Sequence, residues 1–336
     1  MANEERDVLQ MDVDFYSEGE RLWGRVCLPP DYKRGEMRPA VVNLVGFTGT
    51  YDYKGSSADL GDRLAREGYV TLGFDYRGFG RSDGRYRFVD PIGQVRDTHN
   101  AVTYMQSRPE VDPNRIALWG RSLGAGIACY AGATDERVSA VVSYAAVSNG
   151  YRWLRHLISG PDWLDMMAEL EADRRARVRD NAEPRTIHAY DIARKRRADY
   201  VAENSEDERL GHIGGEILLE SAGAIADFAP EAVIHRITGR PVLFVHAESD
   251  VTVPPSETLQ LYKKCGEPKA LWLIPAAASQ GHYGMFKGQG EKADDTPWAR
   301  LTRPIIHWLT ENFPIEPPEW VTRGLVKGKF QVSEIV

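Results

Sequence analysis

Cysteine is scarce in this chain, and long apolar runs are missing. The 336 residues include only Cys27, Cys129 and Cys265, which are widely spaced and form no C-x-x-C pair. We therefore expect a reduced, cytoplasmic protein. No stretch of about 18 apolar residues exists, and residues 1–15 are charged without an apolar segment. We accordingly expect neither a membrane span nor a signal peptide.

The chain also has no excess of positive charge. Lysine and arginine number 42 against 49 aspartates and glutamates, which gives a formal net charge of −7. This acidity argues against nucleic acid as the main partner, so we expect a small-molecule substrate.

The length permits one large domain or a core with an inserted unit. Residues 328–336, the ending of the C-terminal tail, could add an edge strand or reach a second subunit, which leaves a homodimer open.

Short apolar runs rich in β-branched residues alternate with helical patterns. Residues 8–29 predict an antiparallel hairpin that turns at Ser17–Gly19. The remaining expected strands cover 40–47, 69–76, 115–120, 137–146, 241–247 and 269–276, and the expected helices cover 57–68, 93–107, 123–133, 255–265 and 298–313. Such alternation predicts an α/β fold, with a mostly parallel central sheet and helices on both faces.

The alternation stops between residues 147 and 235. This block contains helical patterns over 152–158, 162–180 and 190–203 and no strong buried strand. We interpret it as an inserted helical cap at the ligand-binding edge of a core built from residues 1–146 and 236–336. The alternative is a longer helical layer. Arginine-rich runs at 174–179 and 194–197 could attract an anion or form a solvated helix face, and Glu220 could face a pocket.

The stretch Gly120-Arg121-Ser122-Leu123-Gly124 fits the pattern G-x-S-x-G between an expected strand and a helix of small residues. In that context the serine lies in a tight turn, with its oxygen exposed at a helix N-terminus. Side chains two residues before and after it would collide with neighbouring strands. The alternative is a chance match in a glycine-containing turn.

A serine nucleophile needs a base and a carboxylate that orients the base. His282 lies in a loop after the last expected strand, whereas His246 lies within a strand and is expected to serve structure. Asp250 follows the strand 241–247, and Glu248 is its local rival. The order Ser122, Asp250, His282 matches one hydrolase architecture.

On these residues the chain resembles the α/β-hydrolase superfamily. Residues 74–84 (FDYRGFGRSDG) resemble its D-x-R-G-x-G-x-S segment, residues 281–286 (GHYGMF) its histidine loop, and residues 248–255 (ESDVTVPP) its acid turn. The details favour the branch of dienelactone-hydrolase-like and X-Pro-peptidase-like esterases.

The resemblance also implies an oxyanion hole. It would use the backbone N–H groups of Phe47, in the loop after the third strand, and of Leu123, after the nucleophile. Val45 stands where many members have histidine, and the Tyr51 hydroxyl is an additional candidate.

The implied activity is ester hydrolysis through an acyl-enzyme on Ser122, with no metal or organic cofactor. A carbon–carbon bond hydrolase and an acyltransferase would use the same triad. A ligand-binding protein on the same fold is the alternative from another class.

Overall fold

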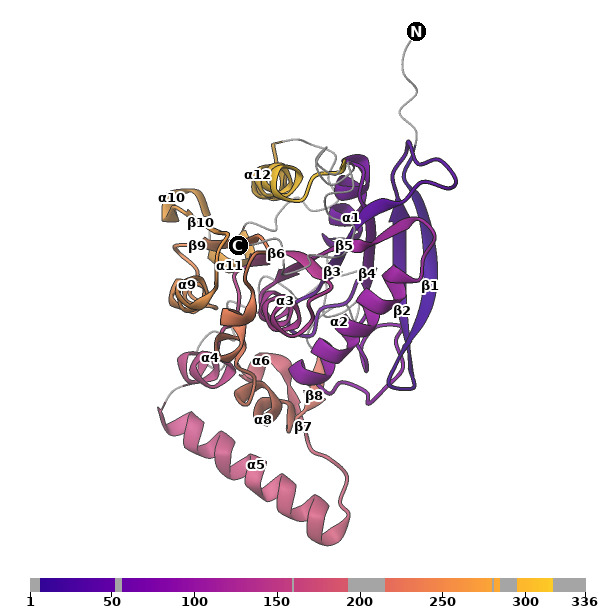
Figure 1. The fold of residues 1–336 in the computed structure, drawn as a ribbon. Helices are drawn as coiled ribbons and strands as arrows, with labels where there is room; N and C mark the ends of the chain where they lie inside the picture. Colours follow the sequence, from indigo (N-terminus) through magenta and orange to yellow (C-terminus); the bar gives the residue numbers. More distant parts are fainter. Residues whose placement is uncertain are drawn as a thin grey trace, which may run out of the picture.

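The computed structural model describes residues 7–51, 56–158, 160–192, 215–279, 281–284 and 295–316. Its centre is an eight-stranded sheet in the order β1-β2-β4-β3-β5-β6-β9-β10 (Figure 1). The bounds are β1 (Leu9–Ser17), β2 (Glu20–Leu28), β3 (Arg38–Leu44), β4 (Val70–Phe74), β5 (Val111–Arg121), β6 (Val138–Tyr144), β9 (Val242–Ala247) and β10 (Lys269–Ile274).

The sheet is antiparallel at one edge and parallel elsewhere. β1 and β2 form the expected hairpin, and β2 pairs antiparallel with β4. Glu18 and Gly19 have φ angles of 52° and 93°, which is the backbone of a tight two-residue hairpin turn. The strands β4, β3, β5, β6, β9 and β10 pair in parallel. The predicted α/β fold with a mostly parallel sheet is therefore confirmed.

Helices cover both faces of the sheet because its central strands are apolar on both sides. Val41 and Val42 are neighbours in β3, yet they belong to two different buried clusters. One face carries α1 (Ser56–Arg66) and α12 (Pro297–Asn312), and the other carries α2 (Pro91–Gln106), α3 (Leu123–Thr134) and α9 (Pro255–Lys264). Short helices α10 (Ala276–Ser279) and α11 (Gly281–Gly284) follow β10.

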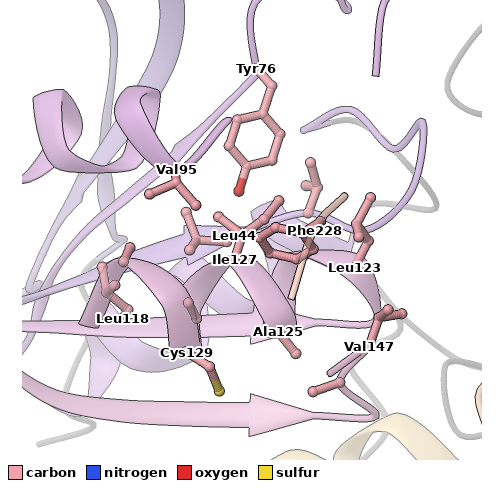
Figure 2. Packing of buried hydrophobic residues seen from close by; sticks show 14 of the residues in the cluster. Leu44, Tyr76, Val95, Leu118, Leu123, Ala125, Ile127, Cys129, Val147 and Phe228 are labelled. Carbon is pink, nitrogen blue, oxygen red and sulfur yellow. The ribbon is translucent and has the colours of Figure 1, made fainter. Parts of the chain in front are cut away.

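Small residues let α3 lie very close to the sheet. Figure 2 shows Ala125, Ile127 and Cys129 of this helix beside Leu118 of β5 and other buried apolar side chains. A Cβ at Gly126 would lie 2.4 Å from the Val147 carbonyl oxygen, so no larger residue fits there without a shift. A Cβ at Gly132 would lie 2.8 Å from a side-chain carbon of Val141 in β6, so the glycines of this helix permit its close packing.

The block 147–235 is mainly helical, with a small sheet of its own. It contains α4 (Gly150–Leu157), α5 (Gly160–Asp180), α6 (Ala189–Ile192), α8 (Ser221–Ala226) and two 3₁₀ turns, η3 (Pro230–Ala232) and η4 (Ile234–Arg236). The strands β7 (Thr186–His188) and β8 (Glu216–Leu218) pair antiparallel. The sequence analysis did not identify these two strands, because three-residue strands are too short to show a period. Beyond Ile192, the expected helix 190–203 lies outside the described residues.

The block packs tightly on the core on one side. Trp153, Leu157, Ile225 and Phe228 are buried in the same apolar cluster as strands β3 and β5. Figure 1 shows α5 as the outermost element, and only Trp163, Met166 and Asp173 of that helix are buried. The division into core and cap domains stays a prediction. No helix in the described ranges is both long and apolar enough to cross a membrane.

Candidate active site

Ser122 lies in a strained turn between β5 and α3. Its φ and ψ angles are 54° and −126°, a conformation that non-glycine residues rarely adopt. Such a residue costs of order 1–3 kcal/mol and persists only where its surroundings fix it. Here the Ser122 N–H donates to the Tyr144 carbonyl at 2.8 Å, and α3 begins at the next residue. The predicted strand–turn–helix context of the serine is therefore present.

The two glycines of the motif are required by close backbone contacts. A Cβ at Gly124 would lie 2.2 Å from the Val45 carbonyl oxygen, at the end of the neighbouring strand β3. A Cβ at Gly120 would lie 2.2 Å from the Gly124 carbonyl oxygen. The expected collision with a neighbouring strand is thus found at Gly124, whereas at Gly120 the obstacle is the first turn of α3.

The loop after β3 lies directly against the nucleophile. A Cβ on Gly46 would be 3.2 Å from the Ser122 Cβ and 3.8 Å from its Oγ. The next residue is Phe47, and Leu123 begins α3. Within the described part of the chain, no acceptor is bonded to the N–H of Phe47 or Leu123. An oxyanion hole needs N–H groups without an internal acceptor near the nucleophile, so these two stay its candidates.

Asp250 and His282, separated by 32 positions in the chain, are in contact. The Nδ1 of His282 is 2.5 Å from Oδ2 of Asp250, and both side chains are buried. The N–H at Nδ1 donates to the carboxylate, which leaves Nε2 as the basic nitrogen of the ring. Glu248 is exposed and accepts the N–H of Ala276, so the contact belongs to Asp250 and not to its rival.

The sheet register brings Ser122 and Asp250 to the same edge. Arg121, the last residue of β5, pairs with Tyr144 of β6, and Tyr144 pairs with Val245 of β9. Ser122 follows the first of these strands directly, and Asp250 follows the last by a short turn. Both therefore lie at the carboxyl ends of parallel strands, where ligands bind in this class of sheet.

The Asp250 carboxylate is ionised despite its burial. Burial opposes its charge, but the interactions and hydrogen bonds with the His282 and His246 rings outweigh that effect and hold the pKa of Asp250 well below its usual range. Its Oδ1 also accepts the N–H groups of Thr252 at 2.9 Å and Val253 at 2.8 Å.

Asp75 connects the D-x-R-G segment to the loop that carries Phe47. Its Oδ1 accepts the N–H of Tyr51 at 2.6 Å, and its Oδ2 accepts the N–H of Arg81 at 2.9 Å. A Cβ on Gly80 would lie 2.1 Å from the Asp75 carboxylate, which explains the glycine there. The sequence marked this segment only by resemblance and assigned no role to Asp75.

The helix α4 contacts two loops of the site. The indole N–H of Trp153 donates to the Thr252 carbonyl at 2.9 Å, and its ring lies edge-on to Phe47 at 6.1 Å between centroids. His156 Nε2 is 2.8 Å from the Val251 carbonyl oxygen. The sequence analysis did not identify these contacts, because partners about a hundred positions away leave no local pattern.

Several charged residues in the described part of the block pair with one another. Arg175 pairs with Glu171, and Arg177 pairs with Asp173 and Glu220. Glu220 also pairs with Arg85, so its carboxylate is part of an ion-pair group that joins the block to the loop after β4. This arrangement favours the solvated-face interpretation for the run 174–179. The run 194–197 lies outside the described residues.

This fold and this arrangement of residues define an α/β-hydrolase. The model of the family described as serine aminopeptidase, S33, matches residues 38–278, and the chain belongs to that family. The protein is therefore an enzyme of the hydrolase class, as the sequence predicted, rather than a binding protein on the same fold.

Known relatives agree with this assignment. The quorum-quenching protein AidA of Acinetobacter baumannii (strain MDR-ZJ06) is 36% identical over 114 residues, but these cover only 34% of this chain and 37% of AidA. The polyketide transferase grgF of a Penicillium species is 28% identical over 286 residues, 83% of this chain and 92% of that protein. The crystal structure of the α/β hydrolase GrgF from Penicillium sp. sh18 covers 91% of this chain and 99% of its own, with a TM-score of 0.74 and 24% identity.

Proposed function

We propose that this hydrolase cleaves a carboxylic ester of a small to medium organic substrate through an acyl-enzyme on Ser122. The observation that carries the proposal is the 2.5 Å contact between His282 and Asp250, at the sheet edge where Ser122 occupies its strained turn. No other serine of the described ranges has a positive φ.

The mechanism follows from the roles of the three side chains. Nε2 of His282 takes the proton of Ser122 as the serine oxygen bonds to the carbonyl carbon. Asp250 stabilises the imidazolium that forms. The ester C–O bond then breaks, and the leaving alcohol takes the proton from His282. A water molecule gives its proton to His282 and attacks the acyl carbon, and the acid departs as Ser122 regains its proton.

The negative charge that develops on the carbonyl oxygen would be held by the N–H groups of Phe47 and Leu123. Removal of one such donor typically costs about 3–4 kcal/mol of transition-state stabilisation. Asp75 supports this loop through its bond to the Tyr51 N–H.

Labelling with a fluorophosphonate, followed by intact mass and peptide mapping, tests the proposal. We expect one adduct on Ser122 in the wild type and none in Ser122→Ala, which should also lose ester turnover. Ser139→Ala is the matched control, because Ser139 bonds to Asn114 at the opposite end of β6. Turnover retained in Ser122→Ala would contradict the mechanism.

Acyl transfer is the second candidate, because the grgF relative is named a polyketide transferase and aligns over most of this chain. The same acyl-enzyme would then give its acyl group to an alcohol or thiol instead of water. Adding a graded series of acceptors to the esterase assay separates the two: a transferase forms acylated acceptor at the expense of free acid. A carbon–carbon bond hydrolase would not turn over simple aryl esters.

We also propose that residues 147–235 act as a cap over the site, which the contacts of Trp153 and His156 with the acid turn support. A cytoplasmic location is proposed from the three cysteines, which are all buried and unpaired. The homodimer stays a prediction, and analytical ultracentrifugation of the full chain tests it.

A further inference from the structure

A second histidine lies beside the carboxylate of the proposed triad. His246 is in β9, and its side chain is fully buried. Its Nε2 is 2.9 Å from the Val253 carbonyl oxygen and 3.4 Å from Oδ2 of Asp250, while its Nδ1 is 2.6 Å from Oγ1 of Thr258 on α9. Both ring nitrogens therefore have polar partners inside the protein.

These partners assign the protons of His246. A carbonyl oxygen only accepts, so Nε2 carries the proton that goes to Val253. In the neutral ring Nδ1 then accepts from the Thr258 hydroxyl. The positive edge of the Nε2–H group consequently points at the region shared by Val253 and the Asp250 carboxylate.

His246 holds the acid turn in two ways. Its bond to the Val253 carbonyl fixes the peptide unit after Val253, and the N–H of the same residue donates to Oδ1 of Asp250 at 2.8 Å. Its N–H edge also lies close to Oδ2, the oxygen that contacts His282 at 2.5 Å. The carboxylate is thus enclosed by two backbone donors on one oxygen and two histidines on the other.

We propose that His246 is a positioning residue for the catalytic acid, and that Thr258 sets the tautomer in which it acts. The inference rests on the proposed function, since it assumes that Asp250 orients His282. A purely structural role would not need this chemistry: an apolar side chain would fill a strand position at lower desolvation cost than an imidazole.

Among the described residues, Asp250 of the acid turn is the charged group in contact with His246. His282 of α11 contacts the same carboxylate, and the Asp250 charge also acts on Tyr144 of β6. Burial, together with that charge, raises the pKa of Tyr144 far above its ordinary value, so Tyr144 stays neutral. Glu257 precedes Thr258 on α9, and its carboxylate accepts hydrogen bonds from Ser148 and Arg152 rather than from His246.

Three variants test the inference through the pH profile of kcat/KM, with active sites counted by fluorophosphonate titration. His246→Leu removes the donor and should lower kcat per titrated site by roughly ten- to a hundredfold, as expected when a catalytic group is misplaced. The acid limb of the kcat/KM profile of this variant should move to higher pH. Without the His246 donor, less of the Asp250 charge is balanced, and that charge favours the protonated form of His282. His246→Gln keeps an N–H near the Nε2 position and should restore most of kcat. Thr258→Val should fall between the wild type and His246→Leu.

His235→Leu is the control, since His235 is exposed in η4. A merely structural role would lower the melting temperature or the titrated fraction without moving the acid limb. An unchanged acid limb and kcat in His246→Leu, or in Thr258→Val if the former does not fold, would overturn the inference.

A readout without activity separates this inference from the proposed function. Nitrogen-15 NMR of labelled histidine in the Ser122→Ala protein should show His246 as the neutral Nε2–H tautomer, and Thr258→Val should perturb that signal. The opposite tautomer would overturn the inference even if the enzyme is active. Failure of wild-type Ser122 to react with the fluorophosphonate would instead count against the proposed function.

Discussion

The indole N–H of Trp153 bonds at 2.9 Å to the carbonyl oxygen of Thr252, two residues beyond Asp250. The same indole ring lies edge-on to Phe47, which is expected to donate to the oxyanion. One side chain of α4 thereby contacts the loop of the acid and the loop of the oxyanion hole. The helix therefore connects these two loops to each other.

Trp153→Phe tests this connection, because it keeps the aromatic ring and removes the N–H donor. Loss of one buried hydrogen bond costs about 1 kcal/mol, so we expect kcat/KM to fall by roughly fivefold with little change in fold. Trp163→Phe is the control, since Trp163, near the start of α5, packs on Tyr151 of α4. Equal effects of the two variants would argue against a specific role of the Trp153 bond.

A buried glutamate holds the block to α9. Glu257 is 1% exposed and accepts hydrogen bonds from the Ser148 N–H and hydroxyl, the Asn149 N–H and the Arg152 guanidinium. Glu231 also pairs with Arg152 but is less buried. The carboxylate of Glu257 therefore does most to fix the start of α4.

Glu257→Gln should lower the free energy of unfolding by about 2 kcal/mol, the range for hydrogen bonds that involve a charged group. Glu231→Gln should cost less than about 1 kcal/mol, because its partner Arg152 is half-exposed and solvent screens that pair. Urea denaturation of the two variants measures both values. A larger loss in Glu231→Gln would show that the more exposed pair holds the block.

The sequence predicts well what depends on local patterns. The strands appear as apolar runs with residues for both faces, such as Val41 and Val42. Ser122 is marked by glycines whose spacing the turn requires. Asp250 and His282 are identified by their places after β9 and β10, although only the fold brings them within 2.5 Å. Their catalytic roles stay predictions until the labelling experiment.

What the sequence does not predict depends on contacts between distant segments. Glu257 and Ser148 are 109 positions apart, and Trp153 and Thr252 are 99 apart. Nothing near Glu257 in the chain distinguishes it from a surface glutamate of an amphipathic helix. Glu220 shows the converse: it stands out in an apolar stretch, but its partners Arg85 and Arg177 come from two other segments.

The glycines give a second stability test. Gly124→Ala would place a Cβ 2.2 Å from the Val45 carbonyl, whereas a Cβ on Gly223 in α8 would meet no atom within 4 Å. We expect Gly124→Ala to lower the free energy of unfolding by about 3 kcal/mol or more, because the backbone beside Ser122 is displaced. We expect the same variant to lose esterase activity. Gly223→Ala should gain about 0.5–1 kcal/mol, because alanine is less flexible in the unfolded chain. Thermal and urea unfolding of both variants distinguish crowding from a general effect of replacing glycine.

The three cysteines should be inert in the folded enzyme. Burial raises the pKa of Cys27 and of Cys265 to about 11, and that of Cys129 to about 12. The thiolate is the reactive form. Almost no thiolate is present at pH 8, and reactivity should rise only as the pH approaches these values.

Iodoacetamide at pH 8 should therefore add no label to the native protein and three labels after unfolding, counted by intact mass. Ala182→Cys, at an exposed position after α5, should take up one label in the native state and shows that the reagent is active. A native wild-type protein that takes up label under the same conditions would show that at least one thiol is accessible, and peptide mapping would identify the segment that opens.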